Sequence, residues 1–215
     1  SITGWMNNPA ILFDPEILEE GARIVREVNA QLAKALGINV AARTTCVKPS
    51  GNASVLLQTG SGIHAEHSQM YIRNVQMTKD SEVTQAIQKT NPYMVEESVW
   101  SASGTDVVVS FPILPKDGSI YKDELIGVDH LEKVKLAQKH WVEAGTNPEL
   151  CADEGVRHNV SNTIIVEDWD EVEKYVFENR NSFAGISFLS AMGDKDFNQA
   201  PNTAVITAEE MVEKY

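Results

Sequence analysis

A long amphipathic pattern near the start of the chain predicts its first helix. Asp14 followed by Pro15 is a helix-start signal, because aspartate caps free N–H groups and proline fits the first helical position. Gly37 is placed to end the helix. Between these residues one apolar stripe recurs at three- and four-residue steps: Ile17, Ile24, Val25, Val28, Leu32 and Leu36. The pattern predicts a helix over about residues 15–36.

Strand-like and helix-like segments alternate along the rest of the chain. Runs of β-branched and apolar residues predict strands at 71–77, 106–112, 160–166 and 183–189. Further helices are predicted to start at four capping residues, namely Ser81, Asp129, Asp168 and Thr207. No linker or shift in composition divides the chain. We therefore expect an α/β fold, with residues 1–215 forming a single domain or part of one.

The segment Arg43–Ser54 (RTTCVKPSGNAS) has the features of a phosphate-binding turn. A β-prone run leads into the turn Pro49–Gly51, and a short helix is expected to begin at Asn52. The first turn of such a helix offers unpaired N–H groups and the positive end of a dipole. Ser50 and Ser54 add hydroxyl groups. By pattern alone, an ordinary turn without a ligand is an equally good interpretation.

Composition and charge narrow the function. The chain carries 18 basic and 31 acidic residues, for a net charge of −13, which disfavours non-specific binding to nucleic acid or anionic membranes. No apolar run reaches the roughly 18 residues that a membrane-spanning helix needs, and no charged-then-apolar leader opens the chain. We expect a soluble, cytoplasmic protein. The start without methionine and a final helix without a C-cap suggest a piece of a longer chain.

Histidines and cysteines give weaker signals. His64 and His67 have a spacing found in metal sites, but the neighbouring glycines favour a loop and no further ligand stands close in sequence. We therefore predict no metal site, and His64 as a pocket-lining residue or as part of a plain surface loop both stay open. Cys46 and Cys151 are too few for a disulfide scaffold, and neither has an activating partner nearby in sequence.

A polar cluster, Arg157–Thr163 (RHNVSNT), stands at the start of the strand predicted at 160–166. Such a cluster would suit the mouth of a barrel, where His158 and Asn159 are candidate pocket-lining residues. Ordinary polarity at a loop-to-strand junction explains it equally well.

Several stretches form a specific set when they are taken together: Arg43–Ser54, Ser61–His64, Tyr71–Val75, Val107–Pro112, His140–Trp141, His158–Thr163, Phe183–Leu189 and Gln199–Pro201. Their order and spacing resemble the C-terminal part of the catalytic barrel of the ribonucleotide reductases. The adenosylcobalamin-dependent group is the most similar. The resemblance covers nearly the whole chain and implies part of a ten-stranded α/β barrel with a catalytic finger loop inside it.

The resemblance also implies a role for the turn. In the family, the matching loop binds the substrate's phosphates through backbone N–H groups and hydroxyls. That role is carried over here to Ser50, Gly51, Asn52, Ala53 and Ser54. Asn52 stands where the family usually has threonine, so it can cap the helix but lacks the hydroxyl. Ala65 likewise replaces a frequent proline.

The family reduces ribonucleotides to 2′-deoxyribonucleotides for DNA replication. A cysteine thiyl radical, generated by homolysis of the cobalt–carbon bond of adenosylcobalamin, abstracts the 3′-hydrogen, and a cysteine pair supplies electrons. The thiyl cysteine is expected on a Cys-x-Glu finger loop, which does not occur in these 215 residues. We therefore name no catalytic residue, expect the catalytic groups upstream of Ser1, and expect the isolated chain to be inactive.

The partners implied by the resemblance are a ribonucleotide, a dithiol reductant such as thioredoxin for the complete enzyme, and the remainder of the barrel, in cis or in trans. Whether the substrate is a diphosphate or a triphosphate stays open. Two alternatives also stay open: a reductase that uses a metal-centre radical, and a non-catalytic split subunit or nucleotide-binding partner. An isolated part-barrel would expose strand edges and apolar surface.

Overall fold

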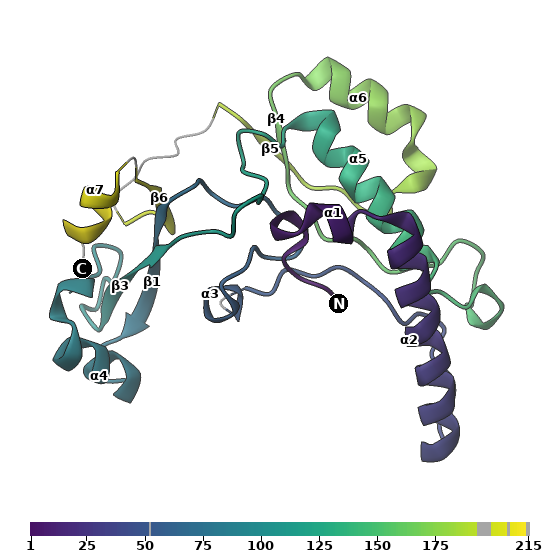
Figure 1. The fold of residues 1–215 in the computed structure, drawn as a ribbon, viewed down its shortest axis with the longest axis horizontal. Helices are drawn as coiled ribbons and strands as arrows, with labels where there is room; N and C mark the ends of the chain where they lie inside the picture. The colour runs from purple at the N-terminus through teal and green to yellow at the C-terminus, as the bar shows by residue number, and fades with distance from the viewer. Residues whose placement is uncertain (52, 193–198, 206, 214–215) are drawn as a thin grey trace. The chain divides into compact units, whose positions relative to one another are not determined.

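The computed structural model describes residues 1–51, 53–192, 199–205 and 207–213, with only the backbone described for Val55 and Glu213. The chain forms two compact units (Figure 1). Unit 1 contains residues 1–66 and 116–192, and unit 2 contains residues 67–115 with the described part of 193–215. The expectation that residues 1–215 belong to a single domain stays a prediction.

Unit 1 is mainly helical. Its elements in chain order are η1 (Trp5–Asn7), α1 (Pro9–Leu12), α2 (Pro15–Leu36), α3 (Ala53–Leu57), α5 (Gly127–Ala137), the π-helical segment η3 (Gln138–Glu143), η4 (Pro148–Leu150), β4 (Ile164–Val166), α6 (Trp169–Glu178), η5 (Arg180–Ser182) and β5 (Phe188–Ser190). β4 and β5 pair in parallel, and α6 lies between them in the sequence, as a crossover between parallel strands requires. The predicted α/β class is confirmed.

Helix α2 begins and ends where the sequence predicts. The Asp14 carboxylate accepts hydrogen bonds from the N–H groups of Glu16 and Ile17, at 2.9 and 3.1 Å. Gly37 follows the helix with φ 67°, a left-handed conformation that glycine adopts without strain. Both boundary signals therefore act through the backbone of the first and last turns.

The apolar stripe of α2 is largely uncovered. The side chains of Ile24, Leu32 and Leu36 are 46, 55 and 70% exposed. Figure 1 shows α2 extending away from the rest of unit 1. The helix is anchored instead by Leu18 and Ala22, which are buried and belong to the core of unit 1. The periodicity thus predicts the helix correctly, while most of its apolar face stays open to solvent.

The core of unit 1 packs around α5 and η3. Five of its fully buried side chains are Trp5, Met6, Leu131, Val142 and Ile164, which come from both ends of the unit's sequence. The prediction of Asp129 as a helix cap is wrong. The N-cap is Ile126, three residues earlier, and the helix begins at Gly127, with φ 54°, so Asp129 lies inside the first turn. A carboxylate there still favours the helix dipole.

The β-prone run before the phosphate turn does not form a regular strand. Arg43 and Val47 make isolated bridges with Thr146 and Val160. The predicted strands at 160–166 and 183–189 are similarly reduced to β4 and β5. These segments are extended but pair over only a few residues.

Unit 2 is built on an antiparallel sheet. Its elements are β1 (Tyr71–Thr78), α4 (Glu82–Thr90), η2 (Pro92–Met94), β2 (Val95–Glu97), β3 (Asp106–Ile113), β6 (Asn202–Ala204) and α7 (Ala208–Glu213). The strand order is β2-β3-β1-β6, and β1 and β3 pair along their whole length, from Tyr71 opposite Ile113 to Thr78 opposite Asp106. The two strands predicted here are confirmed.

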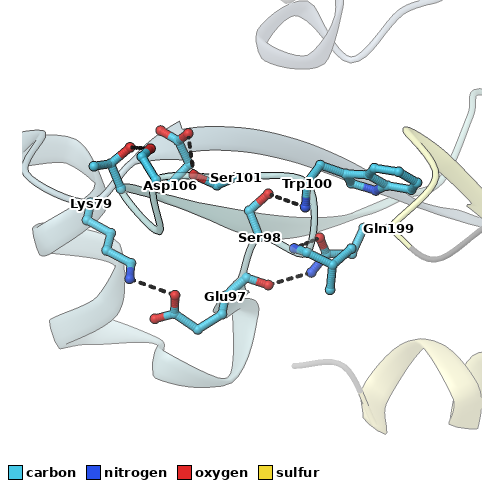
Figure 2. Close-up of polar contacts among 10 residues, drawn as sticks. Lys79, Glu97, Ser98, Trp100, Ser101, Asp106 and Gln199 are labelled. Carbon is cyan, nitrogen blue, oxygen red and sulfur yellow. Dashed lines mark hydrogen bonds and ion pairs between the residues drawn. The ribbon is translucent and has the colours of Figure 1, made fainter.

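Polar contacts hold the end of this sheet together (Figure 2). Lys79 Nζ lies 2.6 Å from Glu97 Oε2, and Ser101 Oγ donates to Asp106 Oδ2 at 2.9 Å. The side chain of Gln199 donates to the Glu97 carbonyl at 2.7 Å and accepts from the Val99 N–H at 2.8 Å. Gln199 therefore ties the segment before β6 to β2.

Among the helices of the described residues, none is long and apolar enough to cross a membrane.

Candidate phosphate-binding site

The predicted phosphate turn lies in unit 1, between the extended segment 43–48 and the short helix α3. Gly51 has φ 56°, and a Cβ added there would meet no atom within 4 Å. Gly51 therefore serves backbone conformation and leaves the outer side of the turn open. Asn52, which the sequence includes in the site, lies outside the described residues.

The described backbone donors of the turn already have acceptors within the protein. The N–H groups of Ser50 and Gly51 donate to the Ser61 hydroxyl oxygen, at 2.9 and 3.3 Å. Those of Ala53 and Ser54 donate to the carbonyl oxygens of Ser50 and Gly51, each at 3.2 Å. A phosphate oxygen must therefore share or replace the Ser61 hydroxyl to receive the first two N–H groups.

The hydroxyl groups assigned from the sequence are engaged as well. Ser50 Oγ lies 2.9 Å from Thr3 Oγ1, and Ser54 Oγ donates to the Gly51 carbonyl at 2.5 Å. Thr3 Oγ1 donates to the Gly60 carbonyl at 3.0 Å and accepts from the Gly62 N–H at 2.8 Å. The structure thus brings Ser50, Gly51, Ala53 and Ser54 together but fixes both serine side chains by internal contacts.

The loop Thr59–His64 forms the wall on which the turn rests. Gly62 has φ 62°, and a Cβ there would lie 3.2 Å from the Lys48 carbonyl oxygen, so glycine permits this close approach. The Gly4 N–H donates to the Gly60 carbonyl at 3.0 Å, and the Trp5 N–H donates to the Gly62 carbonyl at 3.2 Å. The first residues of the chain therefore hold the loop in place.

The buried side-chain amide of Asn7 also holds this loop. Asn7, only 7% exposed, accepts through Oδ1 from the Thr59 hydroxyl at 2.9 Å and from the Gly60 N–H at 2.6 Å. Its Nδ2 donates to Glu66 Oε1 at 2.7 Å and to Ser119 Oγ at 3.0 Å. All four side-chain positions of the amide are filled. The sequence gives no local signal for Asn7, because its partners are remote along the chain.

One histidine ends this loop and a second packs against it. His64, a candidate pocket-lining residue, donates from Nδ1 to the Ser61 carbonyl at 2.9 Å, since a carbonyl can only accept. His130 of α5, 3% exposed, donates from Nε2 to the Ile63 carbonyl at 3.1 Å. The rings meet edge to face with centroids 6.5 Å apart. Burial, and secondly the charge of His64, lower the pKa of His130 to about 4, partly opposed by the bond to Ile63.

The other candidate residues have separate surroundings. His158 donates from Nδ1 to the Thr45 carbonyl at 2.9 Å, and the Asn159 side chain is exposed. A cavity of about 420 Å³ lies among residues 143–157, with Cys151 and Arg157 in its lining, and none of the three predicted pocket residues lines it. The pocket-lining roles of His64, His158 and Asn159 stay predictions.

Asn162, from the same polar cluster, has a structural role. It is 7% exposed, donates from Nδ2 to the Gly185 carbonyl at 3.0 Å, and accepts from the Ser187 N–H at 3.3 Å. It thereby fixes the segment before β5 against β4.

The two cysteines are free thiols in this fold. Cys151 Sγ lies 3.6 Å from the Asn147 carbonyl and 3.5 Å from the Val156 carbonyl, so its surroundings are ordinary hydrogen-bond acceptors. Within the described ranges no group of three or more His, Cys, Asp and Glu side chains could hold a metal ion.

Comparisons with known proteins agree with the sequence resemblance. No protein-family model matches the chain. The adenosylcobalamin-dependent ribonucleoside-triphosphate reductase of Euglena gracilis is 25% identical over 191 residues, which cover 87% of this chain and 24% of that protein. A probable adenosylcobalamin-dependent ribonucleoside-triphosphate reductase of Dictyostelium discoideum is 27% identical over 123 residues, covering 57% of this chain and 16% of that protein. The chain thus spans a quarter or less of the length of the curated relatives it matches.

The fold has a solved counterpart. The crystal structure of a B-12 dependent (class II) ribonucleotide reductase matches 93% of this chain and 26% of its own chain, with a TM-score of 0.71 and 19% identity. The similarity to ribonucleotide reductases of the adenosylcobalamin-dependent group is therefore confirmed in sequence and in fold. The described residues contain a four-stranded and a two-stranded sheet and do not by themselves form a ten-stranded barrel.

Proposed function

We propose that this chain is the phosphate-loop part of an adenosylcobalamin-dependent ribonucleotide reductase, acting in the cytoplasm. The complete enzyme reduces ribonucleotides to 2′-deoxyribonucleotides through a thiyl radical. The observation that carries the proposal is that two comparisons point to the same group of enzymes. The sequence match covers 87% of the chain, and the structural match covers 93% of it. Both relatives are named as triphosphate reductases that depend on adenosylcobalamin, which favours a triphosphate substrate and cobalamin over a metal-centre radical.

In this proposal the turn Pro49–Ser54 holds the substrate's phosphates. The chain as a whole is acidic, with a net charge of −13, so its overall field repels an anion. A phosphate must therefore be held by local donors. The N–H groups of Ser50 and Gly51 suit this role, because their present acceptor is a single side-chain hydroxyl, with which a phosphate oxygen can share them.

Other parts of the enzyme must come from outside these 215 residues. No Cys-x-Glu sequence is present, so we propose that the thiyl cysteine belongs to another segment. The same holds for the cysteine pair that receives electrons from a dithiol reductant such as thioredoxin, and for the remaining strands of a ten-stranded barrel. The exposed apolar side of α2 supports this, since Leu32 and Leu36 are more than half exposed and would be buried by a further layer.

The cavity among residues 143–157 does not fit adenosylcobalamin. A cavity of about 420 Å³ suits a small ligand, whereas a corrin ring with its nucleotide arm is far larger than the ligands that cavities of roughly 300–1,000 Å³ enclose. We therefore propose that the cofactor is held elsewhere in the enzyme.

The test starts by sequencing the coding DNA across both ends of the segment and expressing the complete reading frame. We expect it to encode a Cys-x-Glu loop and to convert CTP to dCTP with adenosylcobalamin and dithiothreitol. The 215-residue chain alone is expected to be inactive. Reduction without cobalamin would favour the metal-radical alternative. Nucleotide binding without any reduction would favour a non-catalytic partner. The proposal would be refuted if the complete protein neither bound nor reduced nucleotides.

A further inference from the structure

Four hydroxyl groups surround the phosphate turn, and each has one proton to donate. The Thr3 hydroxyl donates to the Gly60 carbonyl, and because its single proton is used there, the 2.9 Å contact with Ser50 Oγ must be donated by Ser50. The Ser54 hydroxyl donates to the Gly51 carbonyl. Three of the four hydroxyl protons are therefore committed to acceptors within the protein.

The fourth hydroxyl, that of Ser61, differs. Its oxygen accepts two backbone N–H groups, from Ser50 at 2.9 Å and Gly51 at 3.3 Å. No described residue accepts its proton, and the residue is only partly buried. Two donors on the oxygen draw electron density from the O–H bond, and hydrogen bonds linked in this way strengthen one another. The Ser61 hydroxyl is thus a polarised donor beside the turn.

The backbone of Ser61 is held firmly. Its carbonyl accepts from the His64 N–H at 3.2 Å and from His64 Nδ1 at 2.9 Å. The flanking Gly60 and Gly62 are bonded to Gly4 and Trp5. Such a donor is pre-organised, because little conformational freedom remains to be lost when an anion binds.

We propose that Ser61 is a further phosphate-binding residue, and that its hydroxyl supplies the side-chain hydrogen bond to a substrate phosphate. An oxygen of a ribonucleoside di- or triphosphate accepts this proton while it approaches the N–H groups of Ser50 and Gly51. The assignment rests on the proposed function of the turn. It differs from the sequence-based assignment, in which Ser50 and Ser54 provide the hydroxyls.

The experiment measures binding of inorganic tripolyphosphate and of CTP to the 215-residue chain by calorimetry. Ser61→Ala is expected to weaken tripolyphosphate binding roughly 10- to 100-fold, the effect of losing one hydrogen bond to a charged group. Ser61→Thr retains the hydroxyl and is expected to stay within a few-fold of wild type. Ser50→Ala is expected to weaken binding less than Ser61→Ala, because the Ser50 proton is used by Thr3.

Two further measurements keep the outcomes distinct. The amide NMR shifts of Ser50 and Gly51 report whether tripolyphosphate reaches the turn. If Ser61→Ala does not fold, Ser61→Cys replaces it, because cysteine is nearly isosteric with serine but is a weak donor. A wild-type chain whose two amides do not respond refutes the phosphate site itself. Wild-type binding at the turn with equal affinity in Ser61→Ala, or in Ser61→Cys where it is used, refutes the role of Ser61 alone.

Discussion

The buried histidine of α5 allows a quantitative test of how the loop at the phosphate turn is held. His130 is 3% exposed and donates from Nε2 to the Ile63 carbonyl. His130→Gln keeps an N–H donor at a similar reach but removes the titrating ring. We expect the variant to be about 1 kcal/mol less stable than wild type at pH 7.5, because packing and bond geometry are imperfectly reproduced.

The pH dependence gives the sign and size of the effect. Burial, and to a lesser extent the charge of His64, lower the pKa of His130 from 6.5 to about 4 in the folded chain. Between these values the unfolded chain binds a proton that the folded chain does not. The neutral ring's contribution is therefore complete above pH 6.5 and is lost as the pH falls towards 4. The full difference is about 3 kcal/mol, of which about 2 kcal/mol is lost at pH 5.

Urea unfolding followed by tryptophan fluorescence measures this loss. Trp100 is the tryptophan of unit 2, so replacing it by phenylalanine in every sample leaves signals from unit 1 alone. We expect His130→Gln to approach and then exceed wild type in stability as the pH falls from 7.5 to 5. His140→Gln is the matched control, since it changes a partly buried histidine that pairs with Glu19 and retains His130. A constant difference between wild type and His130→Gln from pH 7.5 to 5 would refute the reasoning.

Three further changes test other parts of unit 1 by the same unfolding assay. Asn7→Ala removes hydrogen bonds that include the one to Glu66 and should cost about 2–3 kcal/mol; an unchanged unfolding midpoint would contradict the role of this amide. Gly145→Ala places a Cβ 2.7 Å from the Thr45 Cβ and should cost about 1–3 kcal/mol; wild-type stability would contradict this clash. Leu32→Lys changes a 55% exposed side chain. It should alter stability by at most about 0.5 kcal/mol, so a large loss of stability would show that this face is covered.

Local signals predicted the helix boundaries well because capping acts over three or four residues. Asp14 and Gly37 bound α2, Asp168 accepts from the Glu171 N–H at 3.0 Å, and Ser81 accepts from the Thr84 N–H at 3.1 Å. The long strands of unit 2 could be predicted equally well from the sequence, since runs of β-branched residues form both the strand and its buried face. Asp129 shows the limit, because a glycine two residues earlier moved the start of the helix.

The sequence could not predict how far each apolar stripe is buried. The pattern of α2 contains the spacing that a packed helix needs, yet Leu36 is 70% exposed. Periodicity records which face is apolar and says nothing about what covers it. The lengths of the short strands β4 and β5 could not be predicted for the same reason, because strand pairing depends on neighbours that the local sequence does not specify.

The turn that is predicted to bind phosphate shows why a motif in the sequence leaves the chemistry of a site incomplete. The motif located Ser50 and Gly51, but the acceptor of their N–H groups is Ser61, the loop around Ser61 is fixed by Asn7, and a further carbonyl of that loop is held by His130. These supports come from the first residues of the chain, from a loop and from α5. Asn7 and His130 thereby hold the loop that carries Ser61. The predicted binding by such a turn therefore depends on the surrounding fold. The Ser61 hydroxyl proton, which no described residue accepts, is identified only when every donor and acceptor around it has been assigned.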